Sequence, residues 1–191
     1  MINTGVTLQN ENILLRPTVE SDFELLATLA KDKGMWVYFT HDLSDKNDFE
    51  TWFNDALKGK EAKTRLPFTV ILKENNMVTG ATSFGNFSVR DKRIEIGWTW
   101  FGPQFWGKGI NTQAKYLMLK YCFEVLELER VELKTDVLNV PARNALLRMN
   151  ITEEGVLRSH TLMTKGRRRD TIYYSVLKNE WQNLKLKNNR E

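Results

Sequence analysis

The spacing of hydrophobic and polar positions changes several times along the chain, and each change marks an expected element. Apolar residues predict a short strand at 12–16 that ends at Pro17. A helix is expected next, capped by Ser21, because apolar residues recur there at helical spacing: Phe23, Leu26, Leu29 and Ala30. A second amphipathic helix is expected from about Asp45, with Phe49, Trp52, Phe53 and Leu57 on its apolar side.

Past Pro67 the spacing becomes that of strands. Residues 68–72 and 77–87 predict two strands joined by the polar turn 74–76. Residues 93–101 alternate, which predicts one side formed by Ile94, Ile96, Trp98 and Trp100 and the other formed by Glu95, Gly97 and Thr99.

The second half mixes both patterns. A helix is expected from about Ile110, a strand at 131–137, and a helix opened by Pro141, which lacks the N–H that would be unpaired there. Two strands at 155–163 and 170–177 flank a turn at 165–167. The order β-α-α-β-β-β-α-β-α-β-β predicts a mixed sheet of about seven strands covered by about four helices.

Composition adds limits to this picture. The chain has 191 residues, 41% of them hydrophobic, with no repeat and no linker. We therefore expect a single domain over 1–191, with a core of about 12–181 and a polar C-terminal tail at 182–191. One cysteine and two histidines argue against a disulfide framework and against a metal site. Without a signal segment or a run long enough to span a bilayer, a cytoplasmic protein with no membrane partner is expected.

Charge and cysteine usage are less informative. The net charge of +4 is mild and argues against direct nucleic-acid binding as the main role. The densest basic run, 165–169, fits a solvated hairpin turn; it could instead attract an acidic acceptor or hold a ribosomal or RNA-associated target. Cys122 lies in mid-helix and is expected to be buried packing rather than a nucleophile.

The chemistry-bearing motif is a strand, then Gln104-x-x-Gly107-x-Gly109, then a helix. Glycines before a helix let the backbone approach a ligand, and the first N–H groups of the helix with its dipole suit a pyrophosphate. A Walker A loop is excluded because Gly109 follows Lys108, and the dinucleotide fingerprint fails at Thr112. On spacing alone, an ordinary glycine turn explains the motif equally well.

Three segments together resemble one family. The Q-x-x-G-x-G motif is similar to the acetyl-coenzyme-A-binding motif of the GNAT acetyltransferase superfamily. The segment 133–149, which contains Asn139, resembles that family's strand-loop-helix after the cofactor helix. Residues 153–181 are similar to the branch that contains the ribosomal-protein N-terminal (alanine/serine) acetyltransferases. The resemblance runs from about residue 14 to 181.

The resemblance implies an α/β (α+β) fold with a mixed, mostly antiparallel sheet. It implies an acetyl-CoA-dependent N-acetyltransferase that transfers acetyl directly to a primary amine, without a metal, as a monomer or homodimer. A protein or peptide N-terminal α-amine, such as that of a ribosomal protein, is the first choice of acceptor by this analogy. Open alternatives are a small-molecule amine, a CoA-binding module without catalysis, and a basic RNA- or ribosome-bound protein.

The resemblance also assigns binding residues. Backbone N–H groups would hold the pyrophosphate in a loop that comprises Gln104, Trp106, Gly107, Lys108, Gly109, Ile110, Asn111 and Thr112. Pantetheine would lie along the strand at Trp98, Trp100 and Phe101, opposite Asn139, with Asn144 a weaker candidate. The acceptor pocket would include Trp36, Tyr38 and Phe39, which could equally cap the core.

Catalysis requires a deprotonated amine, because an ammonium group is not a nucleophile. Glu95, on the motif strand beside Gly97, is the first candidate for the base; the alternative is an ordinary exposed or ion-paired glutamate beside Arg93. His160 is the second candidate. The chain carries Leu146 and Ala142 where relatives have a tyrosine or serine acid, so Tyr173 or Tyr174 would have to replace it. Asn150 stands where the family has glycine and is expected to adopt its left-handed conformation.

Overall fold

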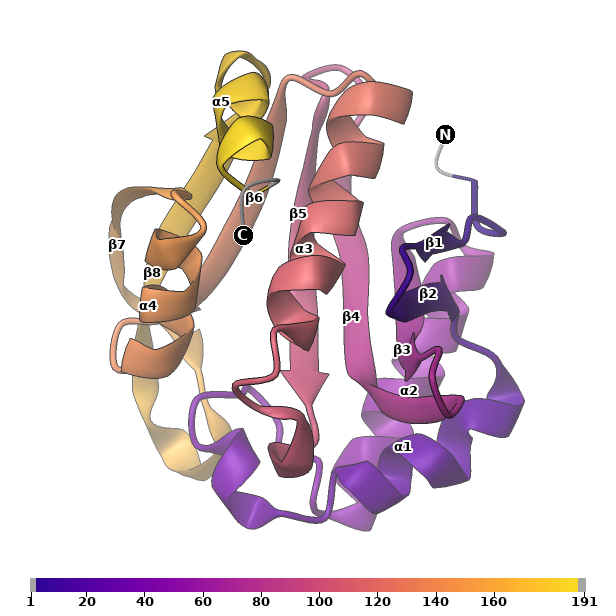
Figure 1. The fold of residues 1–191 in the computed structure, drawn as a ribbon. Coiled ribbons are helices and arrows are strands. Elements are labelled where there is room, and N and C mark those ends of the chain that lie inside the picture. The colour runs from indigo at the N-terminus through magenta and orange to yellow at the C-terminus, as the bar shows by residue number, and fades with distance from the viewer. Residues whose placement is uncertain (1–2, 189–191) are drawn as a thin grey trace.

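The computed structural model describes residues 3–188, which form one mixed sheet with helices on both faces (Figure 1). Over these residues the sheet has eight strands in the order β1-β2-β3-β4-β5-β6-β8-β7: β1 (Leu8–Gln9), β2 (Ile13–Pro17), β3 (Arg65–Leu72), β4 (Met77–Ser88), β5 (Arg93–Phe101), β6 (Arg130–Asp136), β7 (Thr152–Leu162) and β8 (Arg168–Leu177). The five α-helices are α1 (Phe23–Leu29), α2 (Lys46–Glu61), α3 (Ile110–Lys120), α4 (Val140–Arg148) and α5 (Lys178–Asn188).

The sheet is mostly antiparallel, as the sequence predicts. Of the seven strand pairings over the described residues, six are antiparallel, and β5 with β6 is the parallel one. The expected counts of about seven strands and four helices are each one short. The two-residue strand β1 pairs with β2, and α5 begins directly after β8.

The C-terminal segment differs from the expected polar tail. Residues 182–188 continue α5, and Leu184 is buried in the main core next to Trp181. Residues 189–191 of the expected tail lie outside the described part. Trp181 and Leu184 lie three residues apart on one face of α5 and dock a helix that is otherwise mostly polar.

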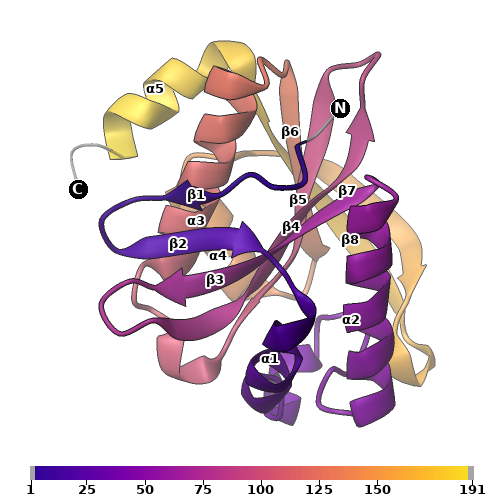
Figure 2. The ribbon, with the colours of Figure 1, turned by 90° about the vertical axis from the view of Figure 1, so that its right-hand side faces the viewer.

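Two hydrophobic cores lie on opposite faces of the sheet (Figures 1 and 2). The larger core packs α3, α4 and α5 against residues such as Ile94 and Ile96 of β5. The smaller core packs α1 and α2 against Ala81 of β4 and Trp100 of β5. No helix in the described part of the chain is long and apolar enough to cross a membrane.

The helix starts agree with the sequence at one position and not at the other. Asp45 caps α2, since its carboxylate accepts hydrogen bonds from the backbone N–H groups of Asn47 and Asp48. Ser21 does not cap α1, and that prediction is wrong. It lies inside a short 3-10 turn, where the buried carboxylate of Asp22 accepts from the N–H of Val19.

The expected alternation of β5 breaks at a β-bulge, which corrects the placement of its tryptophans. Trp98 has φ +52°, and both Trp98 and Thr99 face Thr82 on β4, because Gly97 pairs with Ser83 and Trp100 with Ala81. The extra residue reverses the side-chain directions beyond it. Trp98 and Trp100 therefore lie on the α1–α2 face, opposite Ile94 and Ile96.

The parallel strands β5 and β6 separate shortly after they meet (Figure 1). They pair only from Arg93 to Glu95 with Arg130 to Glu132, and the last six residues of β5 have no pairing with β6. Glu95 is thus the last paired residue of β5. The bulge at Trp98 stands on the separated part of the strand.

The basic run at 165–169 is not simply a solvated turn, so that interpretation is wrong. Arg169 is buried and donates from Nε to Thr171 Oγ1 at 3.0 Å. Arg167 pairs with Asp136, a fully buried carboxylate. Arg168 donates from Nε to Ser159 Oγ at 3.1 Å, so all three arginines have partners within the chain, because β8 begins at Arg168 and draws the run into the sheet.

Candidate active site

The loop before α3 presents backbone N–H groups to solvent. Gly107 and Gly109 have φ values of +73° and +75°, a left-handed conformation that favours glycine. Gly109 is the N-cap of α3, and no side chain of the described residues caps that helix. The N–H groups of its first turn, with the positive end of the helix dipole, form a site that fits a diphosphate.

The side chains of this loop are mostly exposed, and two contacts hold it in place. Trp106 donates from Nε1 to the carbonyl of Phe101 at 2.7 Å, which fixes the loop to the end of β5. The ammonium of Lys108 lies 5.9 Å from the ring of buried Phe105. Gln104 is exposed as well, so it stands free to contact a ligand.

A buried lysine lies one turn into α3. Lys115 is 7% exposed, and its ammonium donates to Asn111 Oδ1. Burial lowers the pKa of Lys115 to about 8. This interaction orients Asn111 within the first turn of α3, whose backbone belongs to the predicted phosphate site.

The predicted pantetheine residues lie on both sides of the separation between β5 and β6. Asn139 is the N-cap of α4: its Oδ1 accepts from Ala142 N at 3.2 Å and its Nδ2 donates to Thr135 Oγ1 at 3.2 Å. Asn144 is exposed on α4. Trp100 is a core residue at 6% exposure, so its side chain supports β5 from the α1–α2 face.

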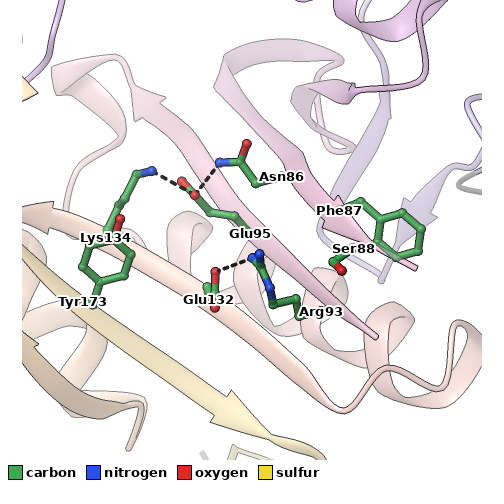
Figure 3. Close-up of a pocket in the computed structure, with 8 residues that line it drawn as sticks. All are labelled: Asn86, Phe87, Ser88, Arg93, Glu95, Glu132, Lys134 and Tyr173. Atoms are coloured by element: carbon green, nitrogen blue, oxygen red, sulfur yellow. Dashed lines mark hydrogen bonds and ion pairs between the residues drawn. The ribbon is translucent and has the colours of Figure 1, made fainter. Parts of the chain in front are cut away.

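A polar pocket of about 400 Å³ opens on the opposite face from α3, where β5 and β6 begin to separate (Figure 3). Its lining combines three carboxylate or amide groups, two cations, a phenol and the end of β4: Asn86, Phe87, Ser88, Arg93, Glu95, Glu132, Lys134 and Tyr173. We call this the Glu95 pocket.

Glu95 is the least exposed carboxylate of this pocket, at 5% exposure. Its Oε2 accepts from Lys134 Nζ at 2.9 Å and from Asn86 Nδ2 at 2.8 Å (Figure 3). The alternative interpretation of Glu95, an exposed or ion-paired glutamate beside Arg93, is met in part. Glu95 is buried, and its ion pair is with Lys134, whereas Arg93 pairs with Glu132 at 3.2 Å. One oxygen, Oε1, has no partner among the residues described and lies beside Gly97.

The other two catalytic candidates lie next to Glu95 on the same face. The ring of Tyr173 is 5.9 Å from Lys134 Nζ, and the ring of His160 is 5.9 Å from that of Tyr173. His160 does not line the pocket; its Nδ1 is 3.1 Å from Thr171 Oγ1. The structure thus brings Glu95 and Tyr173 into one pocket, and His160 lies outside it, next to the Tyr173 ring.

The remaining proton-donor candidates lie elsewhere. Tyr174 is on the opposite face, where its hydroxyl donates to Glu153 at 2.9 Å and accepts from Arg143. Leu146 is buried in the larger core, which agrees with the absence of an acid at that position. Asn150 has φ +57°, which confirms its expected left-handed conformation.

The aromatic segment after α1 divides between core and surface. Trp36 is 3% exposed, and its indole donates to the carbonyl of Ala30 at 2.9 Å. Tyr38 and Phe39 are half-buried, with the Phe39 ring 5.2 Å from that of Trp36. These two side chains are the accessible part of the predicted acceptor residues.

Sequence reasoning did not find Lys134 and Asn86. Lys134 alternates with Glu132 along β6, so a polar side of that strand was visible. What could not be read from the sequence is the register, which places Glu95 opposite Glu132 and hence close to Lys134.

The arrangement supports proton transfer by a carboxylate, and the single cysteine is not placed to act as a nucleophile. Cys122 is fully buried, and burial raises the pKa of its thiol well above the usual value. Within residues 3–188, no group of three or more His, Cys, Asp and Glu side chains could hold a metal ion. The Glu95 carboxylate has donors at Oε2 and, from the described residues, none at Oε1, so Oε1 can accept a proton from an amine.

Comparison with known proteins gives consistent matches. The family description Acetyltransferase (GNAT) domain matches residues 12–152. The chain is 33% identical over 187 residues to the putative ribosomal N-acetyltransferase YdaF of Bacillus subtilis (strain 168), covering 92% of this chain and 97% of that protein. It is 32% identical over 181 residues to the uncharacterized N-acetyltransferase p20 of Bacillus licheniformis, covering 92% and 98%. A crystal structure of a GCN5-related N-acetyltransferase from Brucella melitensis superposes with a TM-score of 0.86 at 27% identity, over 95% of this chain and 83% of that one.

Proposed function

This chain belongs to the GNAT acetyltransferase family and is an N-acetyltransferase, and we propose that it transfers acetyl from acetyl-CoA directly to a primary amine. The first choice of acceptor is a protein or peptide N-terminal α-amine. The name of the YdaF relative, a putative ribosomal N-acetyltransferase, supports a protein acceptor.

The observation that carries the proposal is the position of Glu95 relative to the phosphate loop. The loop lies at the start of α3, on one face of the sheet, while the Glu95 carboxylate opens into a pocket on the other face. Between them β5 and β6 are not paired. A long thiol cofactor held by its diphosphate at the loop has a route between these strands to the Glu95 pocket.

Different residues of this chain bind the cofactor and carry out the proton transfers. Backbone N–H groups from Gly107 to Thr112 bind the diphosphate, whereas that of Trp106 donates to the Pro103 carbonyl, and Asn139 borders the pantetheine arm. Acetyl-CoA, when bound, supplies a thioester whose C–S bond breaks as the amine nitrogen bonds to the carbonyl carbon. Glu95 takes up the proton of the amine at Oε1, and Lys134 and Asn86 hold the other oxygen in place. Tyr173 is the hydroxyl of the pocket that can supply a proton to the leaving thiolate.

One observation favours a second candidate, a CoA-binding module without catalysis. Leu146 is buried and replaces the tyrosine acid of many relatives, and Ala142 likewise offers no proton. Measuring thiol release against a panel of peptide, amino-acid, polyamine and antibiotic amines separates the two. Release that depends on the amine supports the enzyme, and its absence with every acceptor supports the module.

Calorimetric titration with acetyl-CoA tests the cofactor site. Gly107 and Gly166 have similar φ values, +73° and +79°, and a Cβ at either position would meet no atom within 4 Å. Gly107→Leu and Gly166→Leu therefore impose the same backbone strain of about 1–2 kcal/mol. We expect Gly107→Leu to abolish acetyl-CoA binding and Gly166→Leu to retain it. Equal affinity in both variants would remove the loop from the phosphate site.

A further inference from the structure

Two buried tryptophans and one arginine carry buried side-chain N–H groups that have no hydrogen-bond acceptor among residues 3–188. Three tryptophans donate their indole N–H to an acceptor: Trp36 to Ala30 O, Trp106 to Phe101 O and Trp181 to Glu124 Oε1. Trp52 Nε1, Trp100 Nε1 and Arg65 Nη2 are buried and have no acceptor among residues 3–188. Buried indole N–H groups usually have a hydrogen-bond acceptor. Three buried donors without one therefore indicate that a bound ligand or water supplies the acceptor.

These three donors belong to one group of touching side chains. The rings of Trp52 and Trp100 are 5.8 Å apart, and the Arg65 guanidinium carbon is 5.5 Å from the centre of the Trp52 ring. We call Arg65, Trp52 and Trp100 the donor cluster. Trp98 covers it, with its ring 4.6 Å from the guanidinium carbon.

The cluster has a positive charge that is not neutralised. Arg65 Nε donates to the hydroxyl of Ser83 at 2.9 Å, which is a neutral acceptor. Burial lowers the pKa of Arg65 to about 10, and the more distant carboxylate of Asp55 only partly opposes this. A carboxylate is the group that would pair with a guanidinium and with indole N–H groups together.

The donor cluster stands in line with the proposed base. Arg65 pairs with Gly85 across β3 and β4, and Gly85 pairs with Glu95 across β4 and β5. Two strand spacings separate the Cα atoms of Arg65 and Glu95 by about 10 Å. Both side chains are on the α1–α2 face. The positions between them and beside Glu95 are glycines, and the Trp98 ring lies over Gly85 while Glu95 Oε1 lies over Gly97.

We propose that the donor cluster binds a carboxylate carried by the acceptor, so that the enzyme selects amines with an anionic group about 10 Å away. This inference rests on the proposed function. An extended peptide rises about 3.3 Å per residue, so the distance corresponds to an acidic side chain two or three residues after the amine. The Trp98 indole, which is half-buried, moves aside to admit the carboxylate.

The first test measures selectivity. Acetylation of the peptide amides Ala-Ala-Asp-Ala and Ala-Ala-Asn-Ala is compared, since they differ only in one charge. A charge-assisted hydrogen bond in a buried site predicts a 10- to 100-fold higher kcat/KM for the acidic peptide.

Two variants and two controls locate the effect. Arg65→Gln removes the charge, and Trp52→Phe keeps a ring but removes the N–H; either should bring the acidic preference to within threefold of unity. Arg148→Gln changes an exposed arginine on α4, and Trp181→Phe removes an indole N–H that already has a partner. Both controls should keep the preference. An equal preference in all five proteins would overturn the proposal.

A binding measurement separates this proposal from the proposed function. The N-acetylated forms of the two peptides cannot be acetylated again, and their binding is followed by intrinsic tryptophan fluorescence. Tighter binding of the acidic form, lost in Arg65→Gln, supports the donor cluster even if no peptide is turned over. Equal binding of the acidic and amide peptides by the unmodified chain refutes it and indicates that the donors meet only buried water.

Discussion

Replacing Glu95 by glutamine tests the proposed base with the least change of shape. The amide keeps one oxygen that can accept from Lys134 or Asn86, so the pocket retains its volume of about 400 Å³. What is lost is the negative charge and the capacity to take a proton. The phosphate loop lies on the other face of the sheet, so it is not altered.

The magnitude follows from these contacts. General base catalysis contributes about 10²- to 10⁴-fold, so turnover at pH 7 should fall by that factor. Two hydrogen bonds to a charged acceptor become weaker, which we expect to lower the free energy of unfolding by about 1–3 kcal/mol. Acetyl-CoA affinity should stay within about twofold, because a residue outside the diphosphate site contributes little to it.

The assay is thiol release at saturating acetyl-CoA from pH 6 to pH 9.5. An α-amine has a pKa of about 8, so above that pH the acceptor loses its proton without help. The variant should therefore recover toward the parent rate as the pH rises. Glu132→Gln is the matched control: it removes a carboxylate from the same pocket, one that Arg93 already binds, and should lower turnover less than tenfold. A uniform loss at every pH, or equal losses in both variants, would refute Glu95 as the base.

Three further outcomes are expected. Lys115→Met should stabilise the fold by up to about 3 kcal/mol at pH 7, since a buried lysine whose pKa falls from 10.5 to about 8 is destabilising when charged; the parent should gain stability between pH 8 and 10.5, and the variant should not, by thermal melts. Asp22→Asn should lower the free energy of unfolding by up to about 3 kcal/mol, because it removes the charge of a buried carboxylate from its pair with the partly exposed Arg16. Despite the opposing effect of burial, Arg16 lowers the pKa of Asp22, so this stability is present above about pH 4 and lost below it, as acid unfolding would show. Cys122→Ala should keep full turnover, because the buried thiol takes no part in direct transfer; loss of turnover with intact folding would contradict it.

Local features of the fold could be predicted well from the sequence. The bounds of β5 coincide with the predicted strand, and the cap of α2 is Asp45 as expected. In both places the signal is local: an alternating pattern, or an acidic side chain before a helix. The prediction that Ser21 caps the helix was wrong because the next residue, Asp22, accepts hydrogen bonds from Arg16 on β2 and Thr69 on β3. The helix α1 begins only after it, at Phe23.

Features that depend on register could not be predicted. The bulge at Trp98 arises from the pairing of β5 with β4, and it reverses the side chains of Trp98 and Trp100. Glu95 was found because it lies on the motif strand, but its partner Lys134 is 39 residues away on β6. Only the parallel pairing of the two strands brings these groups together.

The donor cluster illustrates the same limit at the level of tertiary packing. Arg65 stands at the start of β3, Trp52 on α2 and Trp100 on β5, and none belongs to a common motif. Their unpaired N–H groups become evident only when the helix packs on the sheet. Neither the hydropathy pattern of the sequence nor the spacing of its residues indicates that a charge such as that of Arg65 will be buried.

The central claim is that this chain uses acetyl-CoA to acetylate an amine in the Glu95 pocket. The most direct measurement incubates the purified chain with acetyl-CoA and the peptide Ala-Ala-Asp-Ala amide, and follows the peptide by mass spectrometry beside thiol release. We expect one acetyl group on the α-amine for each thiol released, with the rate reduced at least 100-fold at pH 7 in Glu95→Gln. Thiol release without acetylated peptide, or an unchanged rate in that variant, would contradict it.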